Sequence, residues 1–549
     1  MNVTRWSMPL RYSAYVLSIL FFFVFLALSG QSWFFGLLAA VAGGLAVLGT
    51  WDIIQRKHTV SRNYPILAHF RYFLESIGPE VRQYFIESDT EERPFSREQR
   101  TIVYQRAKNV LDKRPFGSQL DMDSEGFEWM YHSIRPVEIP DPDFRVRVGA
   151  SRKRPYDVSV FNISAMSFGS LSANAILSLN EGARMGGFYH DTGEGSISRY
   201  HLKPGGDLVW EIGSGYFGCR NKDGSFNEDK FRENARRDQV KMIEVKLSQG
   251  AKPGHGGILP GAKVTPEIAE ARGVTVGEDV VSPASHSAFS TPIELLEFID
   301  HLRELADGKP VGFKLAIGHP WEWFAIVKAM LETGRRPDFI VVDGGEGGTG
   351  AAPLEFINRL GMPLIEALLL VHNSLVGANL RSEIAIGAAG KITSAFNIAR
   401  ILALGADWCN AARGYMFALG CIQALNCHTG RCPSGVATQD PKRSRHLDVE
   451  DKSQRVANFH RNTVLALANL LGAAGLRHPR ELGPEHIIRR VSRTTVHSYM
   501  DLYRFVEPGA LVNGGKVEHS VFDQFWECAR ADSFDAPPFV LELRKTKLH

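Results

Sequence analysis

Residues 407–439 read DWCNAARGYMFALGCIQALNCHTGRCPSGVATQ, and the rest of the chain is arranged around this stretch. Its first six residues are mostly apolar and predict a short buried strand, which ends at Arg413 and Gly414. Three of the chain's six cysteines follow in a C-x5-C-x4-C-P pattern: Cys421, Cys427 and Cys432. A flavin phosphate loop next to an iron–sulfur cluster has this pattern.

The spacing of these three thiols narrows the kind of metal site. A structural zinc ion takes four ligands, often paired as C-x2-C, and this spacing does not fit. The bacterial C-x2-C-x2-C cluster run is also absent. Three thiolates on one loop hold three irons of a cubane, which predicts a [3Fe–4S] cluster. Cys409 alternates inside the strand and is expected to be a packed core thiol, and Cys219 and Cys528 are expected to be unliganded.

Composition and charge indicate which general class of protein this is. The 549 residues are 44% hydrophobic and 22% charged, as in ordinary globular proteins. A net charge of +3 is too balanced to suggest nucleic-acid binding. Six cysteines in so long a chain form no disulfide framework, so a reducing compartment is expected.

The N-terminus differs from the rest. Residues 13–29 and 33–51 carry no charge, and each is close to the ~20 residues that cross a bilayer. Only Gly30, Gln31 and Ser32 separate them, which predicts a tight transmembrane hairpin. Basic residues on both outer flanks place the body of the protein in the cytoplasm, at the cell membrane. A cleaved signal peptide and a buried helical pair of a soluble oligomer are the alternatives.

The predicted organisation has four parts. Residues 1–57 form the membrane hairpin, 58–154 a helical docking segment, 155–440 a barrel, and 441–549 a C-terminal helical extension. In the second part, residues 66–85 have helical periodicity, and residues 96–113 begin like a capped helix. In the last part, residues 456–491 are expected to be helical.

Residues 157–414 alternate strand-like and helix-like stretches. Eight strands alternating with helices predict an α/β fold of the (β/α)8 barrel type rather than an open sheet. The strands are expected at residues 158–166, 188–192, 242–247, 279–282, 311–317, 338–343, 383–387 and 407–412. The helices are expected at residues 171–185, 292–305, 321–333, 364–378 and 394–404.

Polar and glycine-rich motifs directly follow the predicted strands, and this is the catalytic face of such barrels. Glycine loops after the seventh and eighth strands match the phosphate site of the fold. Lys314 lies inside the fifth strand, where a buried ammonium needs an anionic partner. The candidate cofactor-binding residues are Met166, Ser167, Thr192, Gln249, Lys314, Gly344, Gly345, Gly390, Lys391, Arg413 and Gly414.

One motif is rejected. Residues 213–218 read GSGYFG, formally G-x-G-x-x-G, but the following CRNKDG is a turn and cannot open the helix that a dinucleotide site requires. Nicotinamide electrons are therefore expected to arrive through a partner.

Residues 164–439 closely resemble the FMN-binding synthase domain of glutamate synthases. The matching stretches are MSFGSLS, TGEG, QGAKPGHGG, LPG, DGGEGGTGA and the cysteine run that ends in GVATQ. The resemblance implies an FMN barrel with a [3Fe–4S] cluster on Cys421, Cys427 and Cys432, and reductive amination of 2-oxoglutarate through 2-iminoglutarate to L-glutamate. With the hairpin, the chain looks like the stand-alone FMN-binding form.

The resemblance has departures. The family's Asn before TGEG is Asp191 here, and an acidic residue of its KPGxGG loop is His255. No cysteine-nucleophile glutaminase domain is recognised in the sequence, so ammonia is expected to be free or delivered by a separate glutaminase subunit.

The expected mechanism starts at the cluster. Electrons enter there from a ferredoxin or an NADPH-linked flavoprotein subunit, and FMN passes them to the imine carbon. Four residues are assigned catalytic roles. Lys314 stabilises the electron-rich flavin edge or a substrate carboxylate, Glu194 and Gln249 orient substrate or move protons, and Lys252 attracts the dicarboxylate.

Other readings stay open. An enzyme acting on another amine or imine, such as an N-methylglutamate synthase, would keep both cofactors. A membrane-bound electron-transfer subunit would also keep both. An IMP-dehydrogenase-like barrel would use one loop cysteine as a nucleophile, and three spaced cysteines count against it.

Overall fold

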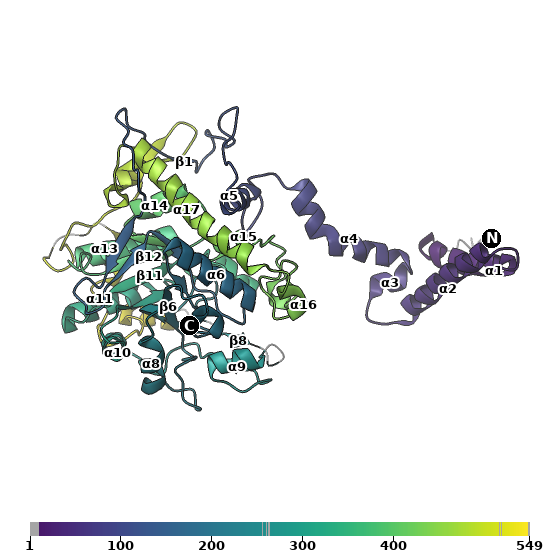
Figure 1. Ribbon diagram of the computed structural model, residues 1–549, viewed down its shortest axis with the longest axis horizontal. Helices are drawn as coiled ribbons and strands as arrows, with labels where there is room; N and C mark the ends of the chain where they lie inside the picture. The colour runs from purple at the N-terminus through teal and green to yellow at the C-terminus, as the bar shows by residue number, and fades with distance from the viewer. Residues whose placement is uncertain are drawn as a thin grey trace. The chain divides into compact units, whose positions relative to one another are not determined.

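A computed structural model describes residues 10–254, 256–259, 261, 264–514, 517 and 519–546 of the chain. The chain divides into two compact units, Met1–Ser96 and Arg97–His549 (Figure 1). The expected boundaries near residues 154 and 440 therefore fall inside one unit.

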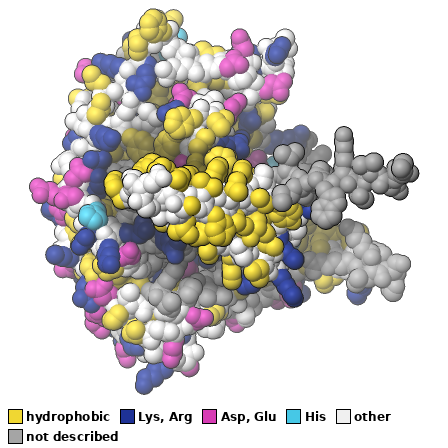
Figure 2. Space-filling view, turned by 90° about the vertical axis from the view of Figure 1, so that its right-hand side faces the viewer, with side chains coloured by type: hydrophobic (Ala, Val, Ile, Leu, Met, Phe, Trp, Pro, Cys, Tyr) yellow, Lys and Arg dark blue, Asp and Glu magenta, His cyan; other side chains and the backbone are white. Residues whose placement is uncertain are grey.

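The first unit is helical. Helices α1 (Ser13–Leu28) and α2 (Trp33–Ile54) form a hairpin around the expected turn, and the Tyr15 and Thr50 hydroxyls hydrogen bond at 3.0 Å across it. Helices α3 (Thr59–Asn63) and α4 (Leu67–Val81) and the π-helical turn η2 (Arg82–Ile86) follow. Hydrophobic side chains gather along the hairpin (Figure 2). Within the described residues, α2 is the one helix long and apolar enough to cross a membrane, and α1 is apolar but shorter.

The second unit contains the predicted barrel. Eight parallel strands close in the order β10-β11-β12-β13-β4-β5-β6-β7. Their bounds are β4 (Phe161–Ile163), β5 (His190–Asp191), β6 (Leu208–Ile212), β7 (Val240–Lys246), β10 (Val311–Leu315), β11 (Phe339–Asp343), β12 (Ala385–Ala389) and β13 (Trp408–Ala411). Each strand is short, and most of its side chains are buried because helices cover the outside while packed side chains fill the inside.

One predicted barrel strand is wrong. Residues 279–282 supply only β9 (Val280–Val281), which pairs antiparallel with β8 (Ile258–Leu259) in the long loop after β7. The missing barrel strand is β6, whose LVWEI residues are all buried and which pairs with β5 and β7. A barrel strand is covered on both faces, which suits the fully buried LVWEI residues and not residues 278–282, where buried Val280 and Ser282 alternate with exposed residues.

Helices surround the barrel (Figure 1). The longest is α17 (Val449–Ala473), which packs against α6 (Ala173–Gly186), α5 (Arg97–Ala107) and α14 (Ala395–Ala403). The other α-helices described in the second unit are α7 (Arg199–Leu202), α8 (Glu228–Ala235), α9 (Pro266–Arg272), α10 (Pro292–Leu305), α11 (Pro320–Thr333), α12 (Leu354–Arg359), α13 (Leu364–Gly377), α15 (Arg413–Ala418), α16 (Pro441–Ser444), α18 (Tyr499–Leu502), α19 (Ser520–Phe525) and α20 (Pro538–Thr546).

The C-terminal part is not purely helical, contrary to the prediction for residues 456–491. After α17, strand β14 (Ile487–Arg490) pairs antiparallel with both β1 (Glu128–Met130) and β15 (Val496–Ser498). Its Ile487 and Ile488 are buried. Two consecutive β-branched side chains favour a strand over a helix, which explains why this stretch is not helical. The segments before and after the barrel are thus joined in one small sheet.

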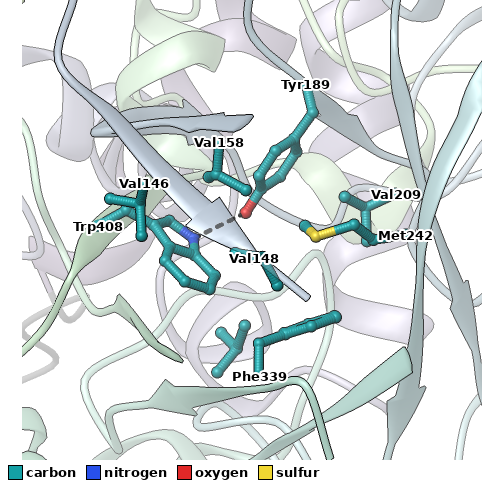
Figure 3. Close-up of a cluster of buried hydrophobic side chains, with 9 residues drawn as sticks. Val146, Val148, Val158, Tyr189, Val209, Met242, Phe339 and Trp408 are labelled. Atoms are coloured by element: carbon teal, nitrogen blue, oxygen red, sulfur yellow. Dashed lines mark hydrogen bonds between the residues drawn. The ribbon is translucent and has the colours of Figure 1, made fainter. Parts of the chain in front are cut away.

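A hydrophobic cluster lies where the β2–β3 hairpin meets the barrel (Figure 3). Strands β2 (Arg145–Val148) and β3 (Tyr156–Ser159) pair antiparallel, and their valines pack against Trp408 and Tyr189 of the barrel strands. The Trp408 indole N–H donates to the Tyr189 hydroxyl at 3.0 Å, which in turn donates to Asn410 at 2.6 Å. The loops after the strands therefore lie at the other end, free to build a site.

Candidate active site

A cavity of about 620 Å³ lies among the loops that follow the barrel strands. It brings together residues separated by more than 250 positions, and six predicted site residues line it: Met166, Ser167, Glu194, Gln249, Lys252 and Arg413. Cys427 lines the same cavity. The cavity is large enough for a drug-sized ligand, and it is lined by charged and polar groups from several loops.

Close contacts between these loops require glycine. At Gly250, a Cβ atom would lie 1.7 Å from the carbonyl oxygen of Gly344, so the loops after β7 and β11 touch only because no side chain intervenes. Gly193 has a φ of +65°, and a Cβ there would lie 2.7 Å from the Ser167 backbone nitrogen. The loops after β4 and β5 are locked together in the same way.

The remaining predicted residues do not line this cavity. Thr192 is fully buried, and its hydroxyl accepts from the Glu211 N–H at 3.1 Å, which is a structural role. The predicted phosphate loops do meet, because a Cβ on Gly414 would lie 3.3 Å from the carbonyl oxygen of Ile392. The others are Lys314, inside β10, and Gly344, Gly345, Gly390 and Lys391, which lie in the loops after β11 and β12. His255 lies outside the described residues.

Three cations act on Glu194, a carboxylate that lines the cavity: Lys252 and Arg272 also line it, and Lys246 does not. Lys246 Nζ lies 2.7 Å from Glu194 Oε2. Burial would raise the pKa of Glu194, but Lys246, Lys252 and Arg272 outweigh it and lower that pKa to about 2. Glu194 is therefore ionised at neutral pH and accepts hydrogen bonds; it does not supply a proton. The group carries a net charge of about +2.

Arg272 was not predicted. It ends α9, is buried, donates through Nη2 to the Phe168 carbonyl at 3.3 Å, and stacks its guanidinium 5.1 Å from the Phe217 ring. Its Nε atom has no hydrogen-bond partner among the described residues. In the sequence it is the last residue of a helix before Gly273, where a basic residue usually serves the helix dipole, so no local signal marks it.

Lys314 lies in the barrel interior, within a cluster of acidic side chains. Its ammonium pairs with Glu211 and lies 3.4 Å from Glu244 Oε1. Ligand oxygens of Asp191, Glu211 and Glu244 all lie within 4.8 Å of one another, and all three residues are buried. One buried ammonium therefore faces three carboxyl groups, an arrangement in which Lys314 takes the place of a bound cation.

Charge balance requires this cluster to hold protons. Burial, then Glu211, raises the pKa of Asp191 to about 7, against the opposing effect of Lys314 and of hydrogen bonds with Gly193 and Glu244. Burial and the Asp191 carboxylate also raise the pKa of Glu244 well above its usual range. Like charges this close in a dry interior cannot all ionise.

The cysteine loop wraps back over the catalytic face. Gln439 Nε2 donates to the carbonyls of Gly169 and Leu171 at 3.0 and 2.9 Å, which ties the end of the loop to the loop after β4. Arg413 Nη1 lies 4.0 Å from Cys427 Sγ, so one side chain touches both the cavity and a thiol. The three loop cysteines are unbridged.

The thiols fit a multi-iron cluster better than a single ion. Cys427 and Cys432 are close enough to Cys421 that, after burial, their charges raise its pKa further. Among the described residues, only Asp191, Glu211 and Glu244 bring three possible ligand atoms within 4.8 Å of one another. The three thiols therefore do not all lie that close together. Zn–S bonds of about 2.3 Å would hold tetrahedral sulfurs about 3.8 Å apart. An iron–sulfur cluster places each thiolate on a different iron and so spreads them.

Comparison with known proteins identifies the family. A model described as a conserved region in glutamate synthase matches residues 145–477, more than half of the chain. The chain belongs to the glutamate synthase family. The glutamate synthase large subunit-like protein YerD of Bacillus subtilis is 40% identical over 83% of this chain and 95% of its own length.

A less similar relative matches a smaller share of the chain. The archaeal glutamate synthase [NADPH] of Methanocaldococcus jannaschii is 34% identical over 64% of this chain and 65% of its own length. Among solved structures, a mutant flavocytochrome b2 with pyruvate bound matches with a TM-score of 0.40 and 12% identity over 77% of this chain and 85% of its own, values too low to carry an argument.

Asp191 offers a test of the buried cluster, because asparagine has nearly the same shape and cannot ionise. Above pH 7, ionised Asp191 costs stability, since its folded pKa lies above its unfolded value of about 3.9. Raising the pH from 5 to 8 should therefore lower the free energy of unfolding of the native protein by about 2 kcal/mol more than that of Asp191→Asn. Urea unfolding of both proteins at both pH values measures this difference. If the stability of the native protein and of Asp191→Asn changed equally with pH, Asp191 would not be the group that titrates.

Proposed function

We propose that this protein is a glutamate synthase-type oxidoreductase that reduces the imine formed from 2-oxoglutarate and ammonia to L-glutamate. The observation that carries the proposal is the group of cations around Glu194, a carboxylate that lines the cavity. Lys246, Lys252 and Arg272 around one ionised Glu194 leave about two positive charges, which match the two carboxylates of 2-oxoglutarate.

FMN is the proposed redox cofactor of the cavity, and when bound it supplies the hydride that converts the imine carbon to the amine carbon. Met166, Ser167 and Gln249 line the cavity and would border the cofactor. The loops at Lys391 and Gly414 would hold its phosphate, because backbone N–H groups beside the start of α14 suit an anion.

The substrate would be held by the chain's own charges. Lys252 and Arg272 bind its carboxylates, and Glu194 accepts a hydrogen bond from the imine nitrogen, which it can do because it is ionised. The overall change consumes one hydride at carbon and one proton at nitrogen, and releases water when the imine forms.

Arg272 offers a test of substrate binding. Replacing it by methionine should raise the KM for 2-oxoglutarate at least tenfold, the ratio expected for about 1.4 kcal/mol of lost carboxylate binding. Arg220 also lies over the Phe217 ring, 5.5 Å from its centroid, and does not line the cavity, so Arg220→Met is the matched control. An unchanged KM in Arg272→Met would remove Arg272 from the substrate site.

Electrons would enter through a [3Fe–4S] cluster on Cys421, Cys427 and Cys432, which Arg413 joins to the cavity. Residues 213–218 are followed by a turn and not by a helix, which supports a separate ferredoxin or NADPH-linked donor. Ammonia would be free or supplied by a separate glutaminase subunit. The apolar hairpin with its basic flanks would anchor the protein in the cell membrane, with the barrel on the cytoplasmic side.

The main alternative concerns the amine substrate. An enzyme that uses methylamine to form N-methylglutamate would share both cofactors. Chemically reduced protein should convert 2-oxoglutarate and ammonia to glutamate faster than it converts methylamine to N-methylglutamate, with product identity read by mass spectrometry. A preference for methylamine would favour the alternative enzyme. Turnover of neither amine would favour an electron-transfer subunit.

A further inference from the structure

Helix α4 carries its apolar stripe on the outside. Leu67, Phe70, Leu74, Ile77 and Val81 recur at the three- and four-residue spacing of one helix face, and Phe73 borders them. In a soluble helix that face is covered, but here Phe70 is 65% and Phe73 55% exposed. The opposite face carries the polar side chains Arg71, Glu75 and Ser76.

The stripe continues past the helix. In η2, Phe85 is 85% exposed and Tyr84 and Ile86 are also exposed. Isolated exposed apolar residues are normal, but this run of large apolar side chains along twenty residues marks a surface made for an apolar environment.

The end of α2 fixes where α4 begins. The buried carboxylate of Asp52 accepts from the Ile66 backbone N–H at 3.0 Å and pairs with His69 Nε2 at 2.9 Å. Gln55 Nε2 donates to the carbonyls of Asp52 and His58, which closes the turn between α2 and the short helix α3. The contacts of Asp52 therefore hold the start of the apolar stripe against the end of the hairpin's second helix.

We propose that residues 67–86 lie in the plane of an anionic phospholipid surface, with the apolar stripe in the lipid and the polar face toward water. The inference rests on the membrane anchoring proposed above. Two features support lipid as the occupant: Asp52 holds the start of the stripe at the end of the apolar hairpin, and exposed basic residues flank it in the sequence. They are Arg56, Lys57, Arg62 and Arg82, the last of which also pairs with Glu87 at 2.9 Å. An amphipathic helix with large aromatic residues on one face and basic residues at its borders suits the headgroup boundary.

The test uses the full-length protein reconstituted in vesicles of phosphatidylcholine and phosphatidylglycerol. A photo-crosslinking phenylalanine analogue replaces Phe73 on the stripe, Glu75 on the polar face as the matched control, or Val47 in the hairpin as a reporter of anchoring. Mass spectrometry then separates lipid adducts from protein adducts. Lipid adducts are expected at positions 73 and 47, with at least tenfold fewer at position 75.

The outcomes separate the two proposals. Lipid adducts at position 47 with protein adducts at position 73 would overturn the lipid-surface helix in favour of a protein contact, and would leave the anchor standing. Equal lipid yields at positions 73 and 75 would also overturn it, since the helix would then have no lipid-facing side. Absence of lipid adducts at position 47 would overturn the anchor and this inference together.

Discussion

Replacing Lys314 by methionine is expected to lower the free energy of unfolding by about 3–5 kcal/mol at pH 8, the cost of leaving buried charges without their partner. Lys314 pairs with Glu211 and Glu244 in the barrel interior, and Asp191 and Asp343 also act on it. Methionine fills a similar volume, so lost packing contributes little. Turnover should be lost as well, while the spectrum of the iron–sulfur cluster should persist.

The pH dependence distinguishes this electrostatic cost from a packing defect. Acidic groups whose folded pKa is raised stabilise the protein at low pH and lose that contribution as the pH rises through the folded pKa. The pKa of Asp191 is raised to about 7 and that of Glu244 is also raised well above its usual range, so the deficit of Lys314→Met should shrink between pH 8 and pH 5. Adding Glu211→Gln to Lys314→Met should recover part of the loss. A deficit that is equal at both pH values in urea unfolding would contradict the cluster.

Replacing Cys427 by serine is expected to abolish the iron–sulfur cluster and to reduce donor-driven turnover at least about a hundredfold, a change of about 2.7 kcal/mol in the barrier. Cys427 lines the cavity and lies beside Arg413, so its loss interrupts the proposed electron path where it enters the cavity. Serine is a poor iron ligand compared with a thiolate. Iron content and an electron paramagnetic resonance spectrum measure the cluster directly.

Cys528 provides the control. It is free and partly buried, and its thiol donates to the backbone carbonyls of Gln524 and Phe525 in the C-terminal part. Cys528→Ser should keep full iron content and turnover. A Cys427→Ser protein with native iron content would remove this thiol from the ligand set, whereas loss of iron in both variants would indicate a general folding defect.

The sequence predicts the barrel because alternating strands and helices with glycine loops leave few other folds. The sequence prediction misses strand β6 (LVWEI). The G-x-G-x-x-G run that follows it is interpreted only as a rejected dinucleotide motif, so the strand before it is not counted. The informative residue was Glu211, because an acid in an otherwise apolar strand needs an interior partner, and Lys314 on β10 is that partner.

Some residues of the candidate site could be predicted from the sequence, and others could not. Glu194, Gln249 and Lys252 could be predicted because each follows a strand within a dense motif, and the structure gathers them in one cavity. Arg272 could not be predicted, because it approaches Glu194 only through the fold of the long loop after β7. The partners of Lys314 could not be predicted either, since closure of the barrel brings together residues from four strands.

The most direct test of the central claim, that the stretch from Trp408 to Gln439 joins a flavin site to an iron–sulfur cluster, is the cofactor content of the purified full-length protein. We expect about one FMN and about three iron atoms per chain, with the electron paramagnetic resonance signal of an oxidised three-iron cluster. Protein that binds flavin but no iron, or zinc in place of iron, would contradict the assignment of Cys421, Cys427 and Cys432. Iron without flavin would contradict the assignment of the cavity.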